Sequence, residues 1–157
     1  MLPVNSPLDL IAQPDALALD LRASTGADAV RALHAQLDSA GGAITDPPRL
    51  LAELVERMAV STVCIADDIA LPHARTTAVS RLVLGVGRVT GGAVFDGEHP
   101  RVRLVFLIGT PKAAVSEYLR LVAALARWLK NTATRAALLA APGEKEFRAL
   151  LLDAAKR

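Results

Sequence analysis

Cysteine and histidine are both scarce in this sequence, which limits the redox and metal chemistry it can support. Cys64 is the only cysteine among 157 residues, so no disulfide can form within the chain. Three histidines accompany it, and they are spread along the sequence. A structural zinc site needs more clustered cysteine and histidine than this. The sequence therefore predicts no metal site.

Long apolar runs are also absent. No uncharged apolar stretch reaches the roughly 20 residues that a membrane-spanning helix needs, which argues against stable membrane insertion. The first residues, MLPVNSPLDLIAQPDAL, have no basic segment ahead of an apolar one, as a signal peptide would. A cytoplasmic location is the expectation from these two features.

The chain has little excess charge and few aromatic side chains. Its net charge is +2 and its aromatic content is 3%. Surfaces that bind nucleic acid combine basic patches with aromatic stacking platforms, so no nucleic-acid partner is expected. The stretch GVGRVTGG has glycines but lacks the lysine and the spacing of a phosphate-binding P-loop. No cofactor is predicted.

Apolar residues, in contrast, make up 52% of the chain, which is enough to build a substantial core. A length of 157 residues fits one domain spanning 1–157. Three prolines, Pro3, Pro7 and Pro14, punctuate the start of the chain, so residues 1 to about 14 are predicted to be irregular.

Hydrophobic periodicity predicts the order of helices and strands. Alternation predicts a half-buried strand at 16–23, and short or continuous apolar runs predict strands at 61–65, 81–89 and 102–108. Helical stripes and capping residues predict helices at 25–40, 46–58, 115–129, 132–141 and 144–155. This order predicts an α/β fold, a single layered domain in which helices flank a mixed β-sheet.

The stretch from Arg57 to Arg75, RMAVSTVCIADDIALPHAR, holds the candidate chemistry. A neutral imidazole is nucleophilic near pH 7, and Pro72 helps to end the apolar segment so that His73 stands clear. Transfer of a phosphoryl group needs mainly positioning and charge stabilisation. Arg57, Ser61 and Thr62 are the nearest donors in sequence for its oxygens. By spacing alone, the same pattern is also typical of an ordinary surface histidine.

The stretch resembles the enzyme IIA domains of the bacterial phosphoenolpyruvate-dependent sugar phosphotransferase system, of the fructose/mannitol (type 2) and nitrogen-regulatory family. Their signature is an arginine, a serine-threonine pair, a glycine-rich turn and then Ala-x-Pro-His. It aligns without a gap on Arg57, Thr62, Ala70, Pro72, His73 and the basic position Arg75. The likeness extends to LDLRASTGADAVRAL, FDG, VRLVFLIGTP and EYLRLVAALARWL.

The resemblance implies a role for each of these residues. His73 would take a phosphoryl group from the histidine-containing phosphocarrier protein and pass it to a IIB domain, or signal through it to a regulatory target protein. Arg57 would bind the phosphoryl oxygens and Thr62 would hydrogen-bond nearby. The protein would then be one component of a transfer chain and not a stand-alone enzyme. Because the sequence contains no IIB or membrane segment, it is nearer the nitrogen-regulatory kind.

Three features of the sequence depart from the family pattern. The glutamate after the arginine is Met58, and the glycines of the turn are Cys64, Ala66 and Asp68. The second histidine, which faces the active one in the family, is Tyr118 here. A tyrosine hydroxyl can hydrogen-bond a phosphoryl oxygen but brings no positive charge. We therefore expect Tyr118 as a second-site contact with slower or less stable phosphorylation, and added repulsion from Asp67 and Asp68.

Two alternatives remain open at this stage. One is a IIA-like regulatory binding protein that is phosphorylated weakly or not at all, which Tyr118 favours. The other is a hydrolase with His73 as general base, for which the sequence offers neither a Gly-x-Ser-x-Gly elbow nor metal-ligand spacing. The remaining histidines and Cys64 are interpreted as structural: His34 as a satisfied helix residue, His99 as an exposed turn residue, and Cys64 as a small buried apolar residue.

Overall fold

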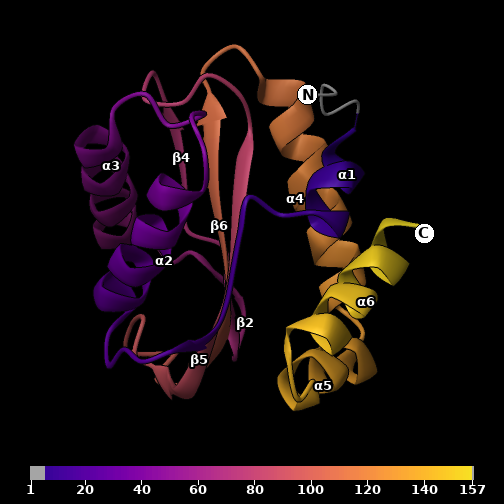
Figure 1. Cartoon of the computed structure of the whole chain (residues 1–157). Coiled ribbons are helices and arrows are strands. Elements are labelled where there is room, and N and C mark those ends of the chain that lie inside the picture. Colours follow the sequence, from indigo (N-terminus) through magenta and orange to yellow (C-terminus); the bar gives the residue numbers. More distant parts are fainter. Residues whose placement is uncertain (1–5, 157) are drawn as a thin grey trace.

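The computed structural model describes residues 6–156, which form a six-stranded mixed sheet with helices on both faces (Figure 1). The strands are β1 (Ala16–Leu21), β2 (Cys64–Ala66), β3 (Ile69–Ala70), β4 (His73–Thr76), β5 (Val83–Ala93) and β6 (Val102–Pro111). The helices are α1 (Pro7–Ala12), α2 (Gly26–Ala40), α3 (Pro47–Val60), α4 (Val115–Leu129), α5 (Thr132–Ala140) and α6 (Glu144–Ala155). The predicted α/β fold with a helix-flanked mixed sheet is confirmed.

Strand β6 organises the sheet. Along one edge it pairs antiparallel with β5, which in turn pairs parallel with β1. Along its other edge it pairs parallel with two short strands in succession, β3 near Leu104 and β4 near Ile108. The chain between β3 and β4 must therefore leave and rejoin the same edge of β6, and His73 is the residue at which it rejoins.

The sheet separates two hydrophobic cores. Helices α2 and α3 cover one face, and α1, α4, α5 and α6 cover the other (Figure 1). Successive residues of β6 alternate between them: Leu104 and Phe106 belong to the core under α4, whereas Val105 and Leu107 belong to the core under α2 and α3. This double-sided burial is why the run VRLVFLI has no polar side of its own.

Two glycines in β5 allow α2 to approach the sheet closely. A Cβ on Gly85 would lie 2.9 Å from Leu37 Cδ1 of α2. One on Gly87 would lie 2.5 Å from Leu21 Cδ1 of the neighbouring β1 and 3.3 Å from Leu33 Cδ2 of α2. Both glycines face the α2 side, and leucine side chains of that core occupy the space that a Cβ would need.

Local capping chemistry explains where α2 and α3 begin. The Thr25 hydroxyl accepts a hydrogen bond from the Asp28 amide at 3.2 Å, and the Asp46 carboxylate accepts one from the Arg49 amide at the same distance. Pro47 occupies the first position of α3, where no intrahelical N–H bond is lost. The predicted starts of both helices are confirmed.

The expectation that residues 1 to about 14 are irregular is wrong where the structure describes them. Residues 7–12 form α1, in which Leu10 and Ile11 are buried and which contacts α4 and α6. Ser6 caps the helix by accepting from the Leu8 amide, and Pro7 occupies its first turn. Proline at that position is compatible with a helix, so its presence was misread as a break. Residues 1–5 lie outside the described residues.

Strand boundaries also differ from the sequence expectation. His73 does not sit in a turn but opens β4, and the predicted strand at 61–65 begins only at Cys64. Strand β5 runs on to Ala93, through Gly91 and Gly92, whose φ angles of +81° and +83° suit glycine. Within residues 6–156, no helix is long and apolar enough to cross a bilayer.

Candidate functional site

His73 reaches the surface because of the way β4 joins the sheet. Pro72, which has no N–H to donate, is buried, and its carbonyl accepts a hydrogen bond from the Ile108 amide at 2.9 Å. In the strand that follows, Ala74 and Thr76 are buried while His73 and Arg75 face outward. The two-residue period of a strand therefore places the imidazole and one guanidinium on the same face.

A backbone hydrogen bond fixes the tautomer of His73. Its Nδ1 atom lies 2.9 Å from the carbonyl oxygen of Leu71. A carbonyl oxygen only accepts hydrogen bonds, so Nδ1 must carry the hydrogen. The Nε2 atom of the neutral ring then keeps its lone pair free, and this is the nitrogen available for attack on an electrophile.

The imidazole opens into a shallow groove between α3, β4 and α4. Besides His73 and Ala74, it is lined by Glu53, Glu56, Arg57, Val60, Arg75 and Tyr118, and its volume is about 470 Å³. The structure thus brings together His73 and Arg57, which are sixteen positions apart in the chain. The sequence interpretation requires these two side chains to lie close together, and both line this groove.

Two arginines supply positive charge beside His73. Arg57 lies in the last turn of α3 and donates from Nη1 to the Ser61 hydroxyl at 2.6 Å. Arg75 donates from Nη2 to the Lys112 carbonyl at 3.3 Å. Each guanidinium has five N–H donors, so most of them stay available for an anion. Ser61 therefore holds the Arg57 side chain, a role the sequence did not assign to it.

Tyr118, from the first turn of α4, faces His73 across the groove. The two ring centroids are 5.7 Å apart, with an angle of 35° between the planes. Burial raises the pKa of the Tyr118 hydroxyl, while the nearby charges of Arg57 and Arg75 act in the opposite direction. The phenol is consequently neutral near pH 7 and can donate one hydrogen bond.

Acidic side chains share the groove with the arginines, and the sequence interpretation missed them. Glu53 and Glu56 both line it, and Glu53 accepts a hydrogen bond from the buried Thr76 hydroxyl at 3.2 Å. Glu53 precedes Arg57 by four residues, so helical spacing could have placed both on one face. Two carboxylates thus offset the two guanidiniums, and an arriving dianion meets a nearly balanced charge.

Thr62 points to a different part of the molecule. Its hydroxyl donates to Asp96 Oδ2 at 3.0 Å and accepts from the Cys64 amide, and it is not among the groove residues. Its role as a phosphate ligand stays a prediction. Asp68, from which repulsion was expected, forms an ion pair with Arg135 at 3.5 Å and does not line the groove either.

Known proteins with similar sequences and structures share this architecture. The PTS system fructose-specific EIIA component of Haloferax volcanii is 30% identical over 113 residues, covering 71% of this chain and 73% of that protein. The nitrogen regulatory protein IIA-Ntr from Neisseria meningitidis superimposes with a TM-score of 0.77 at 20% identity, covering 90% of this chain and 99% of that one.

A second similar structure is a complex from Escherichia coli, enzyme IIA of the mannitol system with phosphorylated enzyme IIB. Its TM-score is 0.75 at 20% identity, and the match covers 88% of this chain and 95% of that chain. The family model of the phosphoenolpyruvate-dependent sugar phosphotransferase system EIIA 2 matches residues 11–154, which include every strand and the groove. The chain therefore belongs to the EIIA 2 family of the phosphoenolpyruvate-dependent sugar phosphotransferase system.

Proposed function

We propose that this chain is a phosphoryl carrier in which His73 accepts a phosphoryl group on Nε2. The donor is the phosphohistidine of the histidine-containing phosphocarrier protein. The observation that carries the proposal is the hydrogen bond from His73 Nδ1 to the Leu71 carbonyl, which in the neutral ring puts the lone pair on Nε2, in a groove with two arginines. Family membership supports the carrier role.

The transfer needs no water, metal or nucleotide in the groove. The Nε2 lone pair of His73 forms a new N–P bond while the N–P bond to the donor imidazole breaks, and that electron pair returns to the donor ring. The hydrogen stays on His73 Nδ1 and remains hydrogen-bonded to the Leu71 carbonyl throughout the transfer. Arg57 and Arg75 lie where their charge stabilises the oxygens of the group in transit.

Apolar residues around the groove support docking of protein partners. Val60 lines the groove with 79% of its surface exposed, and Leu119, next to Tyr118, is 57% exposed. A IIB domain is the proposed phosphoryl acceptor, by analogy with the Escherichia coli mannitol complex, and a regulatory target is the alternative. The proposal includes the cytoplasmic location expected from the sequence, because all partners must share a compartment.

Phosphoryl labelling tests this function directly. The protein is incubated with labelled phosphoenolpyruvate, enzyme I and the phosphocarrier protein, and the label is mapped by mass spectrometry. We expect one label per chain, acid-labile and base-stable as a phosphoramidate is, on His73. A label on another residue would overturn the site assignment. The same mixture with a well-characterised IIA protein confirms that the donor proteins are active.

Tyr118 favours a second candidate function, a IIA-like regulator that is phosphorylated weakly. Its neutral phenol lies where a cationic imidazole would help to hold the dianion. Tyr118→His is therefore expected to shift the phosphoryl-transfer equilibrium toward this protein by about three- to tenfold, through partial positive charge near the phosphoryl group.

The measurement for this variant is the labelled fraction at equilibrium, together with the transfer rate and the phosphohistidine lifetime. Tyr118→Phe is the matched control, since it removes only the hydroxyl. If Tyr118→His leaves all three quantities at the value of the unmodified protein, the tyrosine does not limit phosphorylation. Efficient transfer by the unmodified protein would favour the carrier over the regulator.

A further inference from the structure

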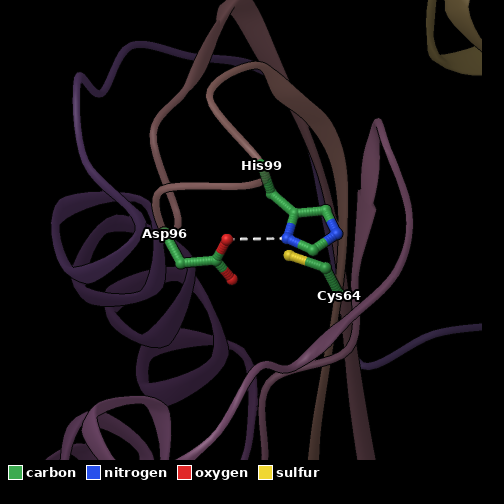
Figure 2. Close-up of side chains that lie close together, drawn as sticks. All are labelled: Cys64, Asp96 and His99. Carbon is green, nitrogen blue, oxygen red and sulfur yellow. Dashed lines mark hydrogen bonds and ion pairs between the residues drawn. The ribbon is translucent and has the colours of Figure 1, made fainter.

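Three side chains with metal-binding atoms lie close together outside the His73 groove. Cys64, Asp96 and His99 each offer one ligand atom, and these atoms all lie within 4.8 Å of one another. Figure 2 shows the Cys64 thiol beside the His99 imidazole, and the Asp96 carboxylate facing the same ring, joined by a dashed line to Nδ1. None of the three lines the His73 groove, so the cluster is separate from the proposed phosphoryl chemistry.

The fold assembles this cluster from two distant parts of the chain. Asp96 and His99 close a tight turn between β5 and β6, in which the His99 amide donates to the Asp96 carbonyl at 3.1 Å. Cys64 is the first residue of β2. The sequence predicted no metal site because Cys64 lies more than thirty positions before Asp96 and His99, and the three residues form no recognisable spacing motif.

Neighbouring groups hold the potential ligands in place. His99 Nδ1 lies 2.7 Å from Asp96 Oδ1, and the Glu98 amide donates to the same oxygen at 2.9 Å. The Thr62 hydroxyl donates to the other oxygen, Oδ2, and accepts from the Cys64 backbone amide. Outer hydrogen bonds of this kind orient the ligands of protein metal sites.

We propose that Cys64, Asp96 and His99 form a binding site for a divalent transition-metal ion of the zinc class. A thiolate, an imidazole and a carboxylate are the ligand types that Zn²⁺ takes, whereas Mg²⁺ and Ca²⁺ prefer oxygen ligands alone. All three residues are half-buried, which leaves a fourth tetrahedral position open to a water molecule. The inference is independent of the proposed function and goes beyond it.

The geometry requires only small side-chain movements. Zinc bonds of about 2.0–2.3 Å place tetrahedral ligand atoms roughly 3.3–3.7 Å apart. The distances between ligand atoms, which reach at most 4.8 Å, must therefore shorten by up to about 1 Å. The 2.7 Å contact between Asp96 Oδ1 and His99 Nδ1 must lengthen by somewhat less.

Metal binding also changes the protonation of the cluster. Burial raises the pKa of the Cys64 thiol, Asp96 raises it further, and the hydrogen bond with Thr62 acts in the opposite direction. The thiol is thus protonated without an ion, and it loses that proton to solvent when the ion binds.

Cobalt titration of the reduced, full-length protein tests the site. Co²⁺ adopts the tetrahedral geometry of Zn²⁺ and reports a bound thiolate through a sulfur-to-cobalt charge-transfer band in the near ultraviolet. We expect saturation at one equivalent, visible bands of tetrahedral intensity, and full displacement by Zn²⁺. Weak binding without the charge-transfer band would overturn the proposal, because the thiolate would then not be a ligand.

Variants assign the ligands. Cys64→Ser and His99→Gln are each expected to weaken Co²⁺ binding by about 100-fold or more, with loss of the charge-transfer band in Cys64→Ser. Asp67→Asn is the matched control, since Asp67 is an exposed acid three residues from Cys64 that lies outside the cluster. This variant should bind Co²⁺ with the same affinity as the unmodified protein.

His73→Asn is the second control, and it separates this site from the phosphoryl-acceptor groove. Retained cobalt binding in that variant supports the proposal, whereas loss of binding would place the ion at His73 and overturn it. Thermal unfolding of each metal-free variant shows whether the fold persists. Should Cys64→Ser fail to fold, alkylation of Cys64 in the folded protein, which metal must protect against, provides the same discrimination.

Discussion

Replacing His73 by asparagine is expected to abolish phosphoryl labelling while leaving the fold intact. The asparagine side-chain amide can donate to the Leu71 carbonyl in place of Nδ1–H, at a similar distance from the backbone. It has no nitrogen with a free lone pair, so no N–P bond can form. Losses from removing a nucleophile are large, and we expect the transfer rate to fall by at least about 10⁴-fold.

The measurement combines labelling with a stability comparison. The free energy of unfolding of His73→Asn should stay within about 0.5 kcal/mol of the unmodified protein, because the half-buried side chain keeps its one hydrogen bond. His73→Gln is the matched comparison, since its longer amide is not placed to restore the Nδ1 contact. Residual labelling of either variant at a comparable rate would show that another residue is the acceptor.

The part of the site that follows from local sequence was predicted well. His73 and Arg57 lie on elements that are close in the chain, and the pairing of β3 and β4 with β6 then places His73 beside the end of α3. The fold class was also predictable, since the burial of β5 and β6 on both faces leaves apolar runs in the sequence that only a few polar residues interrupt. Tyr118 was expected opposite His73 only from the family resemblance, and the ring contact confirms that proximity.

Side-chain contacts that depend on tertiary packing could not be predicted from the sequence. The direction of Thr62 is decided by Asp96, which lies 34 positions away and comes alongside only when the β5–β6 turn forms. His99 was expected to be an exposed turn residue, yet only 15% of its side chain is exposed because Cys64 and Asp96 lie against it. Spacing rules predict which residues are neighbours within one helix or strand. They do not predict contacts between segments that are distant in the chain.

The role of Arg88 likewise could not be read from the sequence, where it is one polar residue in an apolar strand. Its guanidinium reaches across the sheet face to the end of α5. Nη1 donates to the carbonyls of Leu138, Leu139 and Ala141 at 2.9, 3.4 and 2.7 Å, and Nε donates to the Leu19 carbonyl at 3.3 Å. The charge also lies 5.8 Å from the centre of the Phe147 ring.

These contacts satisfy carbonyls that have no partner within the helix. The last carbonyls of an α-helix lack intrahelical donors, and the negative end of the helix dipole favours a cation there. Arg88 therefore joins β5 and β1 to α5 and, through Phe147, to α6, the pair of helices at one end of the molecule (Figure 1).

Arg88→Met is accordingly expected to lower the free energy of unfolding by about 3 kcal/mol. Methionine fills similar space but leaves several carbonyls without a donor, each at a cost of roughly 1 kcal/mol or more when water cannot reach it fully. Arg88→Lys should lose about half as much, because one ammonium group cannot reach all four oxygens. Denaturant unfolding followed by circular dichroism measures both values.

The matched control is Arg31→Met, which removes an exposed arginine of α2 that pairs with Asp28 three residues earlier. Surface pairs of this kind contribute little, so a change below about 0.5 kcal/mol is expected. Hydrogen exchange then locates the effect: in Arg88→Met the amides of α5 and α6 should lose protection before those of β5 and β6, since the central strands keep their own cores. Equal stability of the Arg88 and Arg31 variants would mean that water replaces the guanidinium and that the helix pair is held by apolar packing alone.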